Sequence, residues 1–299
     1  MFAALLMAHG TPETLDEMPA YLTLVRGGRP PSDALVEEMR HNYAALGGRS
    51  PLTDITGQQA VALAKRLGPA VPVFVGMRNW RPFIADALAA AARAGVRRVL
   101  GIPMAPQFST LSVQKYIDAA RAALPDGIEF ACVEPFFDHP LLIDAFAARL
   151  REACSREGEE VIFTAHSLPE RVIRDGDPYA RQVAATAAAV AARGGLERYR
   201  LAYQSAGRTP EPWIGPELGQ MIRELAAAGA RSALVAPIGF VCDHTEVLFD
   251  IDVQAAALAR EAGIGLRRTE SLNASPLFIE LLASLVEESL RRQSTVVSR

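Results

Sequence analysis

Short apolar runs alternate with helix-like stretches along the whole chain, and this alternation limits the possible folds more than any other feature. The apolar runs that we expect to form strands lie near 2–8, 71–75, 97–102, 129–133, 160–164, 199–204, 232–237 and 264–268. The stretches with a helical pattern lie at 54–67, 81–94, 112–123, 140–155, 179–193, 214–228 and 246–262. Strands that alternate with helices form βαβ units and parallel sheets. The sequence therefore predicts an α/β fold.

Two pairs of similar segments indicate that the chain is built from two related halves. "LLMAHGTPE" (5–13) is similar to "IFTAHSLPE" (162–170), and "AGVRRVLGIP" (94–103) is similar to "AGARSALVAP" (228–237), in the same order. Chance similarity is the alternative, since such pairs arise easily in an alanine-rich chain. A length of 299 residues also suits two domains.

The two similarities predict three parts of the chain. We expect an N-terminal half over 1–140, a C-terminal half over 141–274, and a C-terminal helix within 275–299 that packs back on the first half.

Composition excludes several classes of function. The net charge is −3, with 31 basic and 34 acidic residues, so no nucleic-acid partner is expected. Cys132, Cys154 and Cys242 form no C-x-x-C pair, which argues against structural zinc and disulfides and favours a reducing cytoplasm. The first apolar run indicates a strand rather than a signal peptide, and the alanine-rich stretch 184–192 is too short to span a bilayer. We expect a cytoplasmic protein without an integral membrane segment.

The residues that could perform chemistry follow predicted strands. His9 and His166 each lie where a strand opens into a loop, and ligands bind at the carboxyl ends of parallel strands. Glu246 and Asp250 are four residues apart, on one face of a predicted helical turn, and such aligned carboxylates could pass a hydrated divalent cation along a row.

Each of these residues also has a structural interpretation. His166 could be a core histidine that bonds to the neighbouring backbone. Glu246 and Asp250 could simply complement the dipole at a solvated helix N-terminus. The G-x-G-x-x-G, Walker A and G-x-S-x-G motifs are absent from the sequence, which argues against an ordinary dehydrogenase, kinase or esterase.

Six motifs together resemble one known family. They are "GG·SPL··IT··Q", "GMR·W·PFI", "AP·FST·SVQ·Y", "TAHSLPE" followed by "DPY", "YQS·G·TP·PW·GPEL" and "P·GFV·DHTEVL·DID". In this order they resemble the ferrochelatases, and among them the compact coproporphyrin III ferrochelatases of Gram-positive and related bacteria. The resemblance extends from about residue 3 to about residue 290. It implies two Rossmann-like, chelatase-like halves, each a parallel sheet flanked by helices, around an interdomain porphyrin cleft.

The resemblance assigns the reaction to three residues. His166 matches the histidine that accepts the pyrrole protons and contacts the metal, and Glu246 matches the glutamate that faces it. Asp250 continues the acidic row as a further metal ligand. His166 and Glu246 are therefore the expected catalytic residues.

The resemblance also implies contacts to the tetrapyrrole. Arg26, Asn42, Tyr43 and Ser50 fall where the family contacts the ring and its carboxylates, and the planar fork of an arginine suits a propionate. His9 occupies the axial-ligand position, where a tyrosine is usual, and a histidine can also ligate haem iron.

Distortion of the porphyrin ring is a further expectation, because a buckled ring exposes its nitrogen lone pairs to the metal. The candidates to press on the ring are Tyr43, Ile55, Met77, Trp80 and Trp213, although such residues are more often plain core.

The expected reaction is the insertion of Fe(II), a substrate, into coproporphyrin III to form coproheme in heme b biosynthesis. Coproporphyrin III is favoured because the chain lacks the hydrophobic membrane-binding lip of the protoporphyrin enzymes. Protoporphyrin IX, a cobalt or nickel chelatase reaction, and a non-catalytic haem or metal carrier are the alternatives. No cysteine follows Cys242, so no iron–sulfur cluster is expected, and no organic cofactor either. We also expect a monomer that contacts a downstream coproheme decarboxylase transiently.

Overall fold

The computed structural model describes residues 1–153, 158–207 and 209–297, and Cys154 lies outside this range. The chain forms two compact units, each of which is described by itself. Unit 1 contains residues 1–105, 111–135 and the chain from Asn273 onwards, and unit 2 contains Pro106–Thr110 and Phe136–Leu272.

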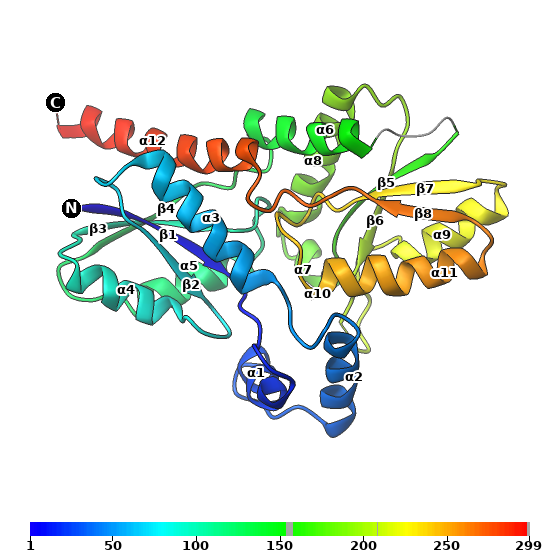
Figure 1. The fold of residues 1–299 in the computed structure, drawn as a ribbon, viewed down its shortest axis with the longest axis horizontal. Helices are drawn as coiled ribbons and strands as arrows, with labels where there is room; N and C mark the ends of the chain where they lie inside the picture. Colours follow the sequence, from blue (N-terminus) through cyan, green and yellow to red (C-terminus); the bar gives the residue numbers. More distant parts are fainter. Residues whose placement is uncertain (154–157, 208, 298–299) are drawn as a thin grey trace. The chain divides into compact units, whose positions relative to one another are not determined.

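Unit 1 is built on a sheet of four parallel strands in the order β2-β1-β3-β4 (Figure 1). The strands are β1 (Phe2–Ala8), β2 (Val73–Met77), β3 (Arg98–Pro103) and β4 (Glu129–Cys132). The flanking helices are α3 (Leu52–Leu67), α4 (Ile84–Arg93), α5 (Val113–Ala122) and α12 (Pro276–Val297). Leu5, Met7, Ile84 and Leu88 are buried in the core between the sheet and α4. An apolar run in β1 and an apolar helix face thus cover each other, which accounts for most of the stability of such a layer.

The last helix belongs to unit 1 because α12 packs on α3. Gln59 donates to the main-chain oxygen of Asn273 at 2.9 Å, and Arg66 contacts Glu280 at 2.8 Å and Glu287 at 3.1 Å. Phe278 of α12 is completely buried.

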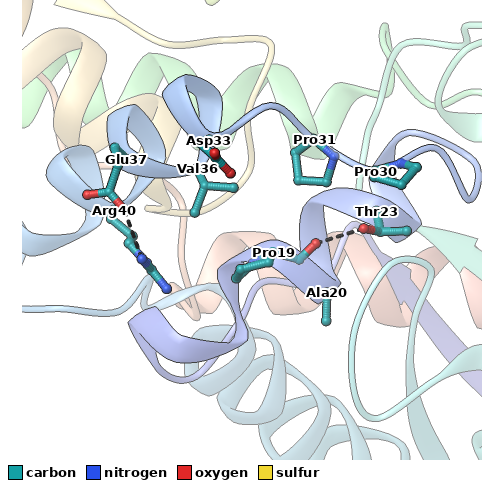
Figure 2. A pocket seen from close by; sticks show the side chains of 9 residues that line it. All are labelled: Pro19, Ala20, Thr23, Pro30, Pro31, Asp33, Val36, Glu37 and Arg40. Atoms are coloured by element: carbon teal, nitrogen blue, oxygen red, sulfur yellow. Dashed lines mark hydrogen bonds and ion pairs between the residues drawn. The ribbon is translucent and has the colours of Figure 1, made fainter.

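A small helical lobe is inserted between β1 and α3. It contains η1 (Leu15–Glu17), α1 (Met18–Val25) and α2 (Asp33–Ala44), none of which the apolar pattern predicted. Its helices pack around a cluster of buried residues that includes Met18, Tyr21, Tyr43 and Trp80. A pocket of about 470 Å³ lies between the two longer helices and the loop that joins them, with prolines and α2 charges in its wall (Figure 2).

Unit 2 repeats the topology of unit 1, with a parallel sheet in the order β6-β5-β7-β8 (Figure 1). The strands are β5 (Glu160–His166), β6 (Arg200–Gln204), β7 (Ser232–Ala236) and β8 (Gly265–Arg268). The helices are α6 (Pro140–Ala153), α7 (Glu170–Arg174), α8 (Tyr179–Gly194), α9 (Leu218–Ala227), α10 (Thr245–Val247), η2 (Leu248–Ala255) and α11 (Ala256–Glu261). In both units the first strand occupies the second place in the sheet, so the two similar Rossmann-like halves predicted from the sequence are confirmed.

The repeated "AH" has the same place in both sheets. β1 ends at Ala8, directly before His9, and β5 ends at His166. Each histidine therefore lies at the carboxyl end of an inner strand, where α/β sheets bind their ligands.

One predicted helix differs from the structure. The stretch 246–262 is not a single α-helix, because α10 is followed by the π-helix η2 and only then by α11. π-helical turns are rare and are frequently found at functional sites. Among the described residues, no helix has the length and apolar character that are needed to cross a bilayer.

Candidate functional site

His166 is fixed at the end of β5 with its imidazole directed at Glu246. Its Nδ1 bonds to the main-chain carbonyl of Ser167, and its Nε2 lies 3.4 Å from Oε1 of Glu246. Because a carbonyl oxygen can only accept a hydrogen bond, Nδ1 must carry a proton, and Nε2 is the nitrogen whose protonation state can change.

The loop after β7 brings Glu246 to the end of β5. Gly239 crosses β5 so closely that a Cβ at this position would lie 2.6 Å from the Cβ of Ala165, and its N–H donates to the carbonyl of Thr164 at 3.1 Å. Only a glycine permits this approach. The loop therefore runs over the strand end and delivers α10 to the side of His166.

The backbone of Glu246 is held by two further side chains. Gln204, at the end of β6, donates from Nε2 to the main-chain oxygen of Glu246 at 2.6 Å. His244 caps α10 and accepts from the N–H of Glu246 at its Nδ1, over 3.2 Å. Burial lowers the pKa of His244, so its ring stays neutral and able to accept.

Asp250 lies on the π-helix and bonds to the hydroxyl of Ser205. Ser205 has a φ of +59°, a conformation that is uncommon for residues other than glycine and that often accompanies a functional role. Burial raises the pKa of Asp250 to about 7, although the Ser205 hydrogen bond opposes this effect.

His166 is the most perturbed histidine of the site. Burial lowers its pKa, but the charge and hydrogen bond of Glu246, the Ser167 carbonyl and the charge of Asp250 together outweigh burial and raise the pKa to about 9. A histidine with a strongly perturbed pKa beside a carboxylate is typical of functional sites. With a pKa of about 9, the imidazole is protonated at neutral pH and faces the carboxylate as a cation.

The site does not form a closed metal cage. Within residues 1–153, 158–207 and 209–297, no three His, Cys, Asp or Glu side chains are gathered closely enough to hold a metal ion. Glu246 contacts His166, whereas Asp250 accepts a hydrogen bond from Ser205. Such an arrangement offers one or two ligands at a time, which suits an ion that passes through and keeps water as its other ligands.

His9 is the corresponding histidine of unit 1, and it is held by two side chains. Its Nε2 lies 3.1 Å from the hydroxyl of Tyr21 and 3.2 Å from Nδ2 of Asn79. The following residue, Gly10, has a φ of +82°, and a Cβ there would lie 2.8 Å from the main-chain nitrogen of Trp80. These contacts hold the loop after β1 and the ring of His9 in one arrangement.

The predicted tetrapyrrole contacts of unit 1 lie in the helical lobe and at the start of α3. Arg26 is exposed at the end of α1, Asn42 is half-buried on α2, and Tyr43 is buried among the lobe residues. Ser50 is buried, and its hydroxyl accepts from the N–H of Leu52 at 3.4 Å. Their roles toward a porphyrin stay predictions.

The residues proposed to press on a ring differ in their burial. Met77 and Trp80 are buried in unit 1, and Ile55 is half-buried there. In unit 2, Trp213 is half-buried, and its indole N–H donates to Thr209 at 2.9 Å.

Comparison with known proteins decides the family. The chain matches the ferrochelatase family over residues 2–290. The chain belongs to the ferrochelatase family. The ferrochelatase of Deinococcus radiodurans is 43% identical over 297 residues, which cover 95% of this chain and 94% of that protein. The coproporphyrin III ferrochelatase of Geobacillus sp. is 37% identical, with 96% of this chain and 97% of that protein covered.

This ferrochelatase also has a structural neighbour among the chelatases. SirB from Bacillus subtilis with Fe3+ has a TM-score of 0.60 at 12% identity, and the comparison covers 96% of this chain and 94% of that one. At this identity the likeness supports the fold alone, and it confirms a chelatase-like fold that consists of two halves. The enzyme is thus a metal chelatase, a lyase of heme biosynthesis whose substrates are Fe(II) and a porphyrin.

Several residues that contact the ferrochelatase's candidate groups were given no role from the sequence. Four of them are Tyr21 and Asn79 beside His9, and Gln204 and Ser205 beside Glu246 and Asp250. Three of them lie within or beside quoted motifs, since Gln204 and Ser205 belong to "YQS" and Asn79 follows "GMR". Their position in or beside these motifs was the only sign in the sequence that they matter for function. It does not reveal which residues they contact.

Proposed function

We propose that this ferrochelatase inserts Fe(II) into coproporphyrin III, with His166 and Glu246 as the groups that receive the metal and the pyrrole protons. The observation that carries the proposal is the 3.4 Å distance between Nε2 of His166 and Oε1 of Glu246 at the carboxyl end of β5. An imidazole beside a carboxylate supplies both a metal ligand and a proton acceptor in one place.

Proton transfer is the first requirement of the reaction. Each Fe(II) that enters the ring replaces two pyrrole protons, so the site must take up and release two protons per turnover. The pKa of His166 is about 9, so the imidazole starts protonated at neutral pH. Fe(II) that binds Glu246 repels this proton and lowers the pKa, so that the proton leaves to water. The freed Nε2 then accepts one pyrrole proton, releases it to water, and accepts the second.

Metal delivery is the second requirement. Asp250 lies on the π-helix, four residues after Glu246 of α10, and its pKa of about 7 leaves it partly ionised at neutral pH. We propose that Fe(II) meets Asp250 and then Glu246, and that it exchanges its waters for carboxylate oxygens on the way. Weak, successive ligands allow the ion to leave for the porphyrin nitrogens, which a full set of protein ligands would prevent.

Porphyrin binding is the third requirement. We propose that Arg26, Asn42, Tyr43 and Ser50 of unit 1 contact the ring and its carboxylates and that His9 is the axial ligand of the iron in the product.

Coproporphyrin III is the proposed substrate because relatives of this name cover nearly the whole chain. Three coproporphyrin III ferrochelatases are 37% to 38% identical to it over 96% or more of its length. We further propose that the enzyme acts as a cytoplasmic monomer that needs no organic cofactor or iron–sulfur cluster, and that it passes coproheme to a decarboxylase by transient contact.

Anaerobic metalation with Fe(II) tests the proposal. The purified protein is supplied with coproporphyrin III or protoporphyrin IX, and turnover is followed by the loss of porphyrin fluorescence. We expect a higher kcat/KM with coproporphyrin III, whereas an equal or higher value with protoporphyrin IX contradicts the substrate assignment. Porphyrin binding without turnover would instead indicate a carrier.

Matched histidine variants test the site in the same assay. His166→Asn is expected to lose most of its activity and to keep its porphyrin affinity. His139→Asn, which changes a histidine at the start of α6, is expected to behave as the unmodified enzyme. Full activity of His166→Asn contradicts the assignment of the reacting groups.

A further inference from the structure

The "DPY" sequence that follows "TAHSLPE" has no role in the reaction described above, yet the structure connects it to His166. Its tyrosine, Tyr179, begins α8 and is buried in unit 2 in a cluster with Ala165, Leu168 and Tyr203. The hydroxyl of Tyr179 donates to the main-chain carbonyl of His166 at 3.0 Å. A residue thirteen positions further along the chain thus bonds to the backbone of the proposed proton acceptor.

The bond from Tyr179 completes the support of one peptide group. The peptide that joins His166 to Ser167 donates its N–H to the carbonyl of Gln204 at 2.7 Å, and its carbonyl accepts from Tyr179. Both polar groups of this peptide plane are therefore used. With both sides held, the plane has little freedom to rotate.

The orientation of this peptide controls the direction of the imidazole. The ring of His166 bonds through Nδ1 to the carbonyl of Ser167, which belongs to the next peptide. The hydroxyl of Ser167 in turn donates to the carbonyl of Ile214 at 2.7 Å. If the peptide between His166 and Ser167 rotates, the Ser167 carbonyl moves with it, and Nε2 no longer points at Glu246.

Tyr179 is itself held by a buried carboxylate. Its N–H donates to Oδ1 of Asp177 at 3.0 Å, and Oδ2 of Asp177 accepts from the N–H of Thr110 at 2.7 Å and from Ser109 at 3.2 Å. Burial, with the nearby Tyr203 and the charge of Glu246, raises the pKa of Tyr179 well above its ordinary value. The phenol therefore stays protonated and able to donate throughout the working pH range.

We propose that Tyr179 is a positioning residue for His166: its hydrogen bond to the His166 carbonyl holds the peptide that keeps Nδ1 on Ser167 and aims Nε2 at Glu246. This inference rests on the role proposed above for His166. Tyr179 touches neither the metal nor the porphyrin in this account. It acts through the geometry of the acceptor, and small displacements of a reacting atom cost much of the rate.

The test compares Tyr179→Phe with Tyr203→Phe. Both tyrosines are buried in the same cluster, and Tyr203→Phe removes a hydroxyl without touching the bond to His166. The loss of a single supporting hydrogen bond predicts that kcat of Tyr179→Phe falls about fivefold to tenfold. We expect the KM for porphyrin to stay within about twofold in both variants, because only the reacting geometry is altered. Tyr203→Phe is expected to keep its kcat.

A spectroscopic readout separates positioning from a general loss of structure. The Nδ1–H proton of His166 is sheltered by its bond to Ser167, so it should give a downfield ¹⁵N-coupled proton signal that is absent from His166→Asn. We expect this proton to exchange faster with water in Tyr179→Phe and at an unchanged rate in Tyr203→Phe. Ser167→Ala, which frees Ser167 from Ile214, should change the signal in the same direction. Thermal unfolding of each variant shows that it is folded.

The possible failures are distinguishable. If His166→Asn keeps full activity, the proposed function fails and the inference falls with it. If His166→Asn is inactive but Tyr179→Phe keeps the kcat and the proton signal of the unmodified enzyme, the positioning role of Tyr179 is overturned alone. Equal loss of kcat in Tyr179→Phe and Tyr203→Phe also overturns it.

Discussion

The substitution Glu246→Gln should lower the pKa of His166, because the glutamate is the main source of the stabilisation of the imidazolium. Glutamine keeps the size of the side chain and removes its charge. In the structure Nε2 of His166 lies 3.4 Å from the carboxylate, and the pKa of His166 is about 9 against an ordinary value of 6.5. Without the charge of Glu246, the effect of burial, which lowers the pKa of His166, is opposed less strongly. The pKa of His166 therefore falls.

The size of the effect follows from the distance and the exposure. Two unit charges 3.4 Å apart interact by about 5 kcal/mol at an effective dielectric constant of about 20, and by about 1 kcal/mol in water. The side chains of His166 and Glu246 are 31% and 45% exposed, so solvent screens the pair, and about 2 kcal/mol is a reasonable value. At 1.36 kcal/mol per pH unit, the pKa of His166 should fall by about 1.5, to about 7.5.

The measurement is an NMR titration of the porphyrin-free protein with ¹⁵N-labelled histidine. The signal of His166 is assigned by its absence from His166→Asn. Glu224→Gln, which alters an exposed glutamate on α9, is the control and should leave the titration unchanged. A His166 pKa that stays near 9 in Glu246→Gln would refute the argument that this carboxylate raises it.

Four further changes have outcomes that the structure predicts. Ser205→Ala removes the hydrogen bond that lowers the pKa of Asp250, so that pKa should rise above about 7, and the acidic limb of kcat/KM for Fe(II) should move to higher pH. Gly239→Ala should push the loop off β5 and reduce metalation at least tenfold, which initial rates with coproporphyrin III will measure. Phe278→Ala should destabilise unit 1 by about 3–5 kcal/mol in urea unfolding, because it empties a fully buried site under α12. Unfolding of His166→Asn and the unmodified protein should differ most below pH 6.5, where the raised pKa of His166 stabilises the fold, and the difference should vanish as pH rises through about 9.

Local patterns in the sequence were sufficient to predict the strands and helices that form the layers of the fold. The apolar runs at β1 and β5 are long and continuous, as inner parallel strands buried on both faces require. The similar segments that contain "AH" also predicted that His9 and His166 take the same place in two related sheets.

The short helices of unit 1 could not be predicted in this way. In α2 only Val36 and Tyr43 are buried, so the helix carries too few apolar residues to show a periodic pattern. Its stability depends on the cluster of buried residues in the helical lobe. Trp80, which follows β2 in the chain, is part of this cluster. Packing against a distant residue leaves no local signal.

The candidate site likewise has features that the sequence predicts and features that depend on the tertiary structure. The order of residues establishes which residue types are available, and that His166 ends a strand and Glu246 follows one. That Nε2 of His166 faces Glu246 depends on the folded chain, because 80 positions separate the two residues and the crossing of Gly239 over β5 brings them together. The same holds for the π-helical turn of Asp250 and for the bond from Tyr179, since both depend on hydrogen bonds between segments that the order of residues does not place side by side.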